Sequence, residues 1–99
     1  MRSLVSTQGL MVYSTLVEAY SWWVGYCEND NTAYANACVK QLEKTMKAVP
    51  QLRKQIEELI QLIELYLSLD ERFRDYSFEL HDKIDMGFKQ LLYSSAKLL

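Results

Sequence analysis

Apolar residues recur at intervals of three and four along most of this 99-residue chain. Between residues 32 and 49 the intervals are unbroken, through Ala35, Val39, Leu42, Met46 and Val49. That spacing puts the apolar side chains on one face of an α-helix, whereas a half-buried strand would need strict alternation. The chain also has only three glycines and one proline, which are few for the tight turns of an all-β protein. The sequence therefore predicts one all-α domain over residues 1–99.

The pattern predicts an antiparallel bundle of three to four helices, with approximate bounds 3–27, 32–48, 51–68 and 71–97. The run Glu28-Asn29-Asp30-Asn31-Thr32 interrupts the first helical pattern. Asp30, Asn31 or Thr32 can cap the second helix, because each has a short polar side chain that bonds to backbone amides. Pro50 is expected to end the second helix, since proline disfavours helical geometry in the residue before it, and it suits the first turn of the third.

The boundary between the last two helices is ambiguous. The segment Ser68-Leu69-Asp70-Glu71 has the capping-box pattern, which favours a break. The heptad register nevertheless continues across residue 70, where no glycine or proline marks a turn. The alternative is that the last two helices are fused into one, about 70 Å long, which would need a second chain beside it in a dimer.

Cysteine usage and hydropathy bear on the compartment. Cys27 and Cys38 are offset by about 7.5 Å along an antiparallel pair of helices, too far for an intramolecular disulfide. Reduced thiols suit the cytosol. No window approaches 18 uninterrupted apolar residues, so we expect no membrane-spanning helix and a cytoplasmic protein that makes no use of a membrane.

No motif in the sequence indicates catalysis. The Glu-x-x-His pattern of helical metal sites is absent, because Phe78 stands three residues before His81, the only histidine. The glycines are isolated, so no phosphate-binding loop or dinucleotide fingerprint is present. No signature joins a cysteine nucleophile to a base. We therefore expect no enzyme activity, no cofactor and no metal.

Aromatic residues are concentrated in the first expected helix. Trp22 and Trp23 point about 100° apart on a helix, so both cannot enter the same seam. Trp23 belongs to the core stripe with Leu16 and Ala19, whereas Trp22 follows a mostly polar line. The aromatic residues outside that core stripe can form an interface patch, because Trp and Tyr are enriched in binding hot spots; the predicted patch is Trp22, Tyr13, Tyr20 and Tyr26.

Charge is segregated along the chain, although the net charge is only −2. Residues 55–86 contain nine acidic and three basic residues, and residues 31–54 contain five basic residues and one acidic residue. The acidic helix face is expected to steer a protein partner, since complementary charge acts on association rate and partner choice; its candidate residues are Glu71, Asp75, Glu79 and Asp82. The basic corner over residues 40–54 is an alternative site for nucleic acid, formed by Lys40, Lys44, Lys47, Arg53 and Lys54.

Two short motifs, the W-x-G Trp23-Val24-Gly25 and the Tyr-x-x-x-Asp segment 66–70, resemble those of the small secreted helical-hairpin proteins of type VII secretion. The resemblance implies two long helices with the W-x-G in the turn between them. In this chain the W-x-G comes only 22 residues in, within the first expected helix, and Pro50 interrupts the second arm. The secreted hairpin is therefore an alternative to the bundle.

These observations together favour a non-enzymatic protein-interaction module. The expected role is an inhibitor or adaptor that engages a larger protein through the aromatic patch and the acidic helix face. Because the apolar content exceeds what one small bundle needs, we also expect a homodimer. A small, acidic, helical chain of this kind fits a phage- or plasmid-encoded inhibitor. A small nucleic-acid-binding subunit that uses the basic corner is the alternative function.

Overall fold

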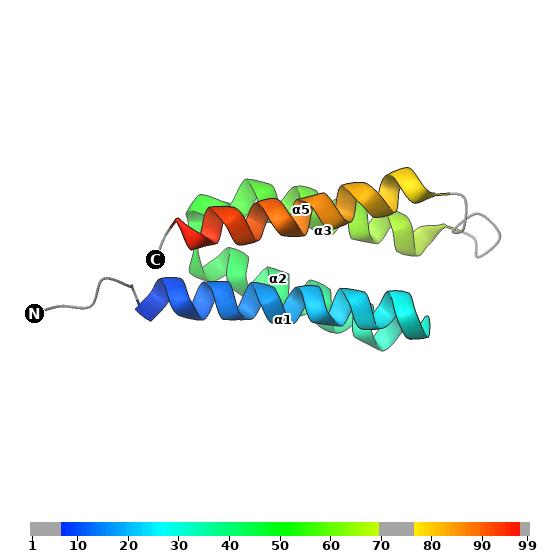
Figure 1. The fold of residues 1–99 in the computed structure, drawn as a ribbon, viewed down its shortest axis with the longest axis horizontal. Helices are drawn as coiled ribbons and strands as arrows, with labels where there is room; N and C mark the ends of the chain where they lie inside the picture. Colours follow the sequence, from blue (N-terminus) through cyan, green and yellow to red (C-terminus); the bar gives the residue numbers. More distant parts are fainter. Residues whose placement is uncertain (1–6, 70–76, 98–99) are drawn as a thin grey trace, which may run out of the picture.

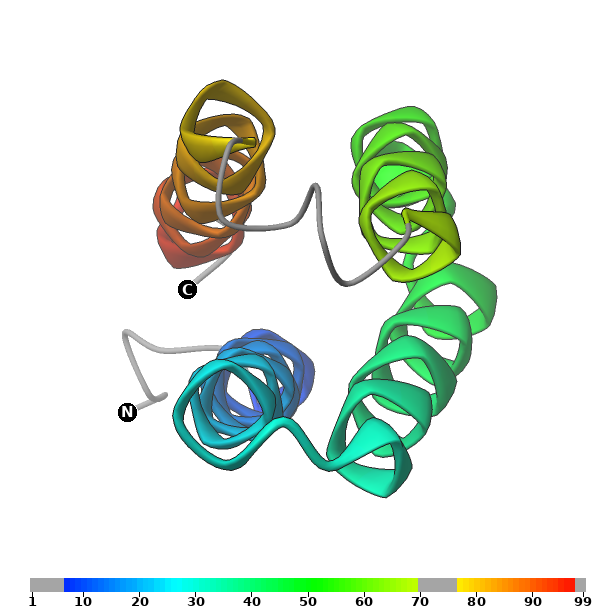
Figure 2. The same ribbon diagram turned by 90° about the vertical axis from the view of Figure 1, so that its right-hand side faces the viewer.

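The computed structural model describes residues 7–69 and 77–97. In it, four helices lie side by side, and each runs antiparallel to the helix before it (Figure 1). They are α1 (Thr7–Asn29), α2 (Thr32–Ala48), α3 (Arg53–Ser68) and α5 (Phe78–Ala96), and the short 3-10 helix η1 (Pro50–Leu52) lies between α2 and α3. Viewed end-on, the four helices stand at the corners of a bundle (Figure 2). The antiparallel bundle predicted from the apolar spacing is confirmed.

The turn between α1 and α2 is built by two short polar residues. Asp30 has a φ of 53°, in the left-handed region that Asp tolerates better than most residues, and its N–H donates to the carbonyl of Tyr26 at 2.7 Å. The side chain of Asn31 accepts a hydrogen bond from the N–H of Ala33 at 3.0 Å. Of the three candidate caps, Asn31 is therefore the N-cap of α2.

Proline places the next boundary, as expected. Helix α2 ends at Ala48, and Val49 adopts an extended conformation with φ −132° and ψ 90°. Pro50 then starts η1, where its missing N–H costs nothing because that position has no helical acceptor.

The alternative of one fused helix over the last half of the chain is wrong. Helix α3 ends at Ser68, Leu69 is extended, and α5 packs back against α3 (Figure 1). The apolar residues on the two sides of the boundary belong to two helices that face the same core. A straight rod in a single chain could not bury both of these apolar faces. The predicted start at residue 71 lies outside the described residues, and α5 itself begins at Phe78.

The core contains the apolar stripes of all four helices. Trp23, Phe88 and Leu42 are among its largest fully buried side chains. Cys38 is also buried, whereas Cys27 is exposed, and both thiols are free, as the geometric argument against a disulfide predicted. Within residues 7–69 and 77–97, every helix is too short or too polar to span a lipid bilayer.

Candidate interaction surfaces

The tyrosines and Trp22 of α1 do not form one patch, because they lie on different sides of the helix. The ring of Trp22 packs on Tyr34 of α2, with ring centroids 5.4 Å apart. On the other flank, the hydroxyl of Tyr20 donates to Asp85 of α5 at 2.7 Å. Tyr13 is exposed and stands nine residues before Trp22, which is two and a half helical turns and therefore the opposite side.

Tyr26 belongs to the core rather than to any surface. Its exposed fraction is 2%, and its ring lies 5.6 Å from that of Trp23 and 6.4 Å from that of Tyr66. The sequence itself indicates that Tyr26 is a core residue. It follows Trp23 by three residues and Ala19 by seven, which places it on the core stripe. In this fold Tyr26 offers no surface for a partner.

Gly25 lets α1 and α2 approach closely at the Trp22 side. A Cβ atom at Gly25 would lie 3.2 Å from Cδ2 of the Tyr34 ring, so a larger residue would push that ring away. Trp22, Gly25 and Tyr34 line a hollow of about 380 Å³ together with Glu18, Ser21 and Asn29. The glycine of the W-x-G motif therefore has a packing reason within α1.

On the opposite flank, Tyr20, Asp85 and Lys89 form a polar bridge between α1 and α5. Two neighbours hold the pKa of Asp85 below its ordinary value. The hydrogen bond from the Tyr20 hydroxyl has the larger effect, and Nζ of Lys89, 3.0 Å from Oδ2 of Asp85, adds to it. The same hydrogen bond to the Asp85 carboxylate raises the pKa of Tyr20. Tyr20 is thus half-buried and already paired, and its hydroxyl links α1 to α5.

Cys27 and His81 meet across the α1–α5 contact, although they are 54 residues apart in sequence. The Cys27 Sγ lies 3.4 Å from Nε2 of His81. Although Cys27 as a residue is exposed, partial desolvation of its thiol raises its pKa to about 11, and the nearby carboxylates of Asp85 and Glu28 contribute less. The thiol is therefore neutral at physiological pH, which is the reverse of an activated nucleophile. Among the described residues no group of three metal-ligating side chains occurs.

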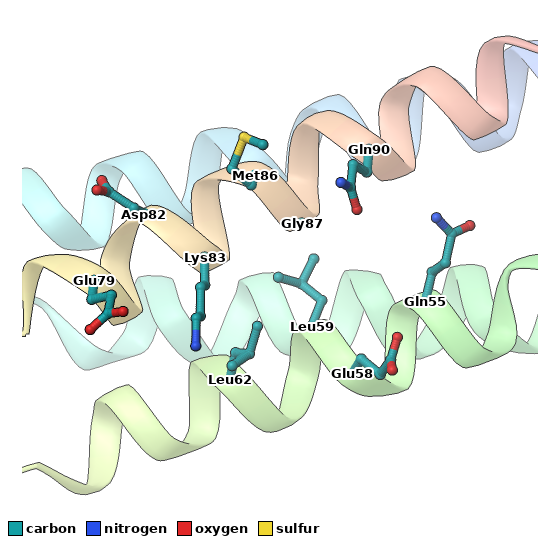
Figure 3. Close-up of a pocket in the computed structure, with 10 residues that line it drawn as sticks. All are labelled: Gln55, Glu58, Leu59, Leu62, Glu79, Asp82, Lys83, Met86, Gly87 and Gln90. Atoms are coloured by element: carbon teal, nitrogen blue, oxygen red, sulfur yellow. The ribbon is translucent and has the colours of Figure 1, made fainter.

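A groove of about 470 Å³ lies between α3 and α5 (Figure 3). Leu59 and Leu62 rise from α3 to form its apolar floor, and Gly87 of α5 faces them. A Cβ atom at Gly87 would lie 2.9 Å from Cδ1 of Leu59, so glycine keeps the two helices close at the floor. Met86 extends the apolar lining with an exposed side chain.

Carboxylates surround this floor. Glu58 of α3 and Glu79 and Asp82 of α5 line the groove, and Lys83 is the one cationic residue among its lining residues. Two of the four acidic residues predicted from the sequence, Glu79 and Asp82, therefore lie together beside an apolar surface. The other two, Glu71 and Asp75, lie outside the described residues.

The predicted basic corner spans α2 and the start of α3. Its three lysines, Lys40, Lys44 and Lys47, are exposed on α2. Arg53 and Lys54 are exposed where α3 begins, and Arg53 pairs with Glu57 of its own helix at 3.6 Å. No aromatic side chain is interleaved with these charges in the sequence, which leaves no stacking platform for bases.

The resemblance to secreted helical hairpins does not extend to the fold. Trp23-Val24-Gly25 lies inside α1 rather than in a turn, and residues 7–69 and 77–97 already contain four α-helices rather than two. Tyr66 is in α3, and Asp70 lies outside the described residues. Comparison with known proteins found no family model, no curated relative and no solved structure that matches this chain.

Proposed function

We propose that this chain is a non-enzymatic interaction module that binds a basic, amphipathic helix of a larger protein in the α3–α5 groove. The observation that carries the proposal is the groove itself, an apolar floor bordered by carboxylates. A groove of this kind takes the apolar face of a helix, with anchor side chains at the i, i+3 or i+4, and i+7 positions.

The apolar floor supplies the affinity in this proposal. Leu62 is half-buried and Met86 is 55% exposed, so both have apolar area still to lose to a partner. The groove's volume is within the range of about 300–1,000 Å³ that is common for ligand pockets. Burial contributes roughly 25 cal/mol for each Å² of apolar surface removed from water.

The carboxylates supply the selectivity. Glu58, Glu79 and Asp82 outnumber the single Lys83, so the groove is electrostatically negative. Lysine or arginine side chains that flank the anchors of a partner helix would complement these charges, which speeds association and disfavours acidic competitors. An inhibitor that masks a basic segment, or an adaptor that recruits one, would act in this way.

A synthetic peptide tests the proposal. The probe is a fluorescently labelled amphipathic peptide with leucines at i, i+4 and i+7 and lysines on both flanks; a matched peptide has glutamate in place of each lysine. Anisotropy should rise with the lysine peptide alone, and added salt should weaken its binding. Equal binding of the two peptides, or no binding of either, would contradict the proposal.

Matched variants locate the site. The double substitution Glu79→Gln with Asp82→Asn removes two groove charges without changing side-chain size and should weaken binding of the lysine peptide. Glu64→Gln is the control, because Glu64 is exposed on α3 but does not line the groove. If Glu64→Gln weakens binding as much as the double substitution does, the attraction comes from the overall charge and the groove is not the site.

A further inference from the structure

We infer that the outer face of α1 is the surface on which a second copy of this chain docks, in a two-fold symmetric dimer. The surface is an apolar seam formed by Leu10, Tyr13, Val17, Tyr20 and Val24, which is separate from the α3–α5 groove. Its spacing, its exposure and its lack of charge favour this partner.

The seam has the spacing of a helix–helix contact. Its residues follow one another at intervals of three, four, three and four, which is the pattern of the a and d positions in a coiled coil. A second stripe, through Leu16, Ala19 and Trp23, already faces the core. Helix α1 is therefore apolar on two sides, and its own bundle leaves most of the second side exposed.

The exposure of the seam is large for apolar residues. Leu10, Val17 and Val24 are 52%, 41% and 36% exposed, and Tyr13 is 36% exposed. Tyr20 is half-buried against α5 and connects the two halves of the seam. A contiguous apolar strip of this kind on a small protein marks an interaction surface.

The absence of charge selects the partner. Glu18 is the only charged residue of α1 between Leu10 and Cys27, and it lies on the α2 flank, where it accepts a hydrogen bond from Gln41 at 2.8 Å. The hydroxyl of Ser21, beside the seam, donates to the carbonyl of Val17 at 3.0 Å. A second helix could therefore cover Ser21 without leaving its hydroxyl donor unsatisfied. The matching surface is an uncharged helix of the same spacing, and α1 of a second copy is such a helix.

The area of the seam is that of one helix–helix contact. Helix α1 is about 34 Å long and 10 Å wide, so it covers about 340 Å², less than half of the roughly 800 Å² per partner of a standard interface. A dimer that buries this seam alone therefore has a small interface and should form at high protein concentration.

Val17 lies at the midpoint of the seam, seven residues from Leu10 and seven from Val24. When the two strips are in register, a parallel two-fold pair places every seam residue opposite its own copy, and an antiparallel pair places only the midpoint there. Val17 should therefore face Val17 of the other copy. This self-contact gives the proposal a test that no other partner can satisfy.

Light scattering of the purified chain should give twice the monomer mass of 11.6 kDa. Val17→Glu and Val17→Lys should each be monomeric, because like charges then meet across the axis. Mixing these two variants should restore a dimer with one copy of each. Met11→Glu is the matched control, since Met11 is 66% exposed on α1 but outside the seam, and it should remain dimeric.

A monomeric wild-type chain at every soluble concentration would overturn the inference, and so would a mixture of the two variants that stays monomeric. If Val17→Glu loses helical circular dichroism, Val17→Cys in a Cys27→Ser background provides a second test. Mild oxidation should link its two copies by a disulfide, and failure to link would also overturn the proposal. Binding of the lysine peptide to the groove should be unchanged in Val17→Glu, so this test is independent of the proposed function.

Discussion

Trp22 and Trp23 are adjacent in sequence but are 37% and 1% exposed, because one step around α1 moves a side chain by about 100°. We expect Trp23→Ala to lower the free energy of unfolding by about 3–5 kcal/mol, since it leaves a cavity in the core. Trp22→Ala should lower it by only about 0.5–1.5 kcal/mol, through loss of the ring contact with Tyr34. Urea denaturation measures both, and equal losses would show that Trp22 is a core residue.

The thiol of Cys27 provides a second prediction at this scale. Its pKa of about 11 means that the thiolate fraction at pH 8 is on the order of 10⁻³, far below that of an ordinary cysteine. The rate of reaction with a disulfide reagent should therefore be low at pH 8 and rise about tenfold for each pH unit up to about pH 11. Cys27→Ser is the control and should abolish this phase, since Cys38 is buried. A rate at pH 8 that equals that of a small-molecule thiol would contradict the raised pKa.

At the scale of single helices, most of what the structure contains could be predicted from local chemistry. The side chain of Asn31 and the fixed ring of Pro50 act on their immediate neighbours, so both boundaries follow from the sequence alone. The side of α1 that each neighbouring helix covers could not be predicted in this way. Whether Tyr20 meets α5 or solvent depends on how the bundle closes, and the apolar pattern of α1 permits either.

The cap of α2 gives the prediction for this scale. Asn31→Ala removes the acceptor for the N–H of Ala33 and should lower the free energy of unfolding by about 1 kcal/mol. Asn36→Ala is the matched control, because Asn36 is exposed within α2, where alanine has the higher helix propensity. Thermal melts of the two variants should shift in opposite directions. A loss in both would mean that asparagine acts by something other than capping.

At the scale of the whole molecule, pairs that depend on the register between helices were beyond the sequence. Cys27 and His81 meet only because α1 and α5 are antiparallel, in the same register that brings Tyr20 to Asp85. The groove likewise needs α3 beside α5, so the pattern of acidic residues predicted a charged face but not its apolar floor. No interval within a single helix contains this information.

Dimerisation should also be visible in the stability of the whole molecule. Because a second copy binds the folded chain and not the unfolded one, the melting temperature of the wild type should rise with protein concentration. High salt should not remove this dependence, since the α1 seam is apolar, whereas it should weaken peptide binding at the acidic groove. Val17→Glu should melt at one temperature at all concentrations, close to that of the dilute wild type, and Met11→Glu should keep the concentration dependence. A wild-type melting temperature that does not change with concentration would mean that the seam stays uncovered in solution.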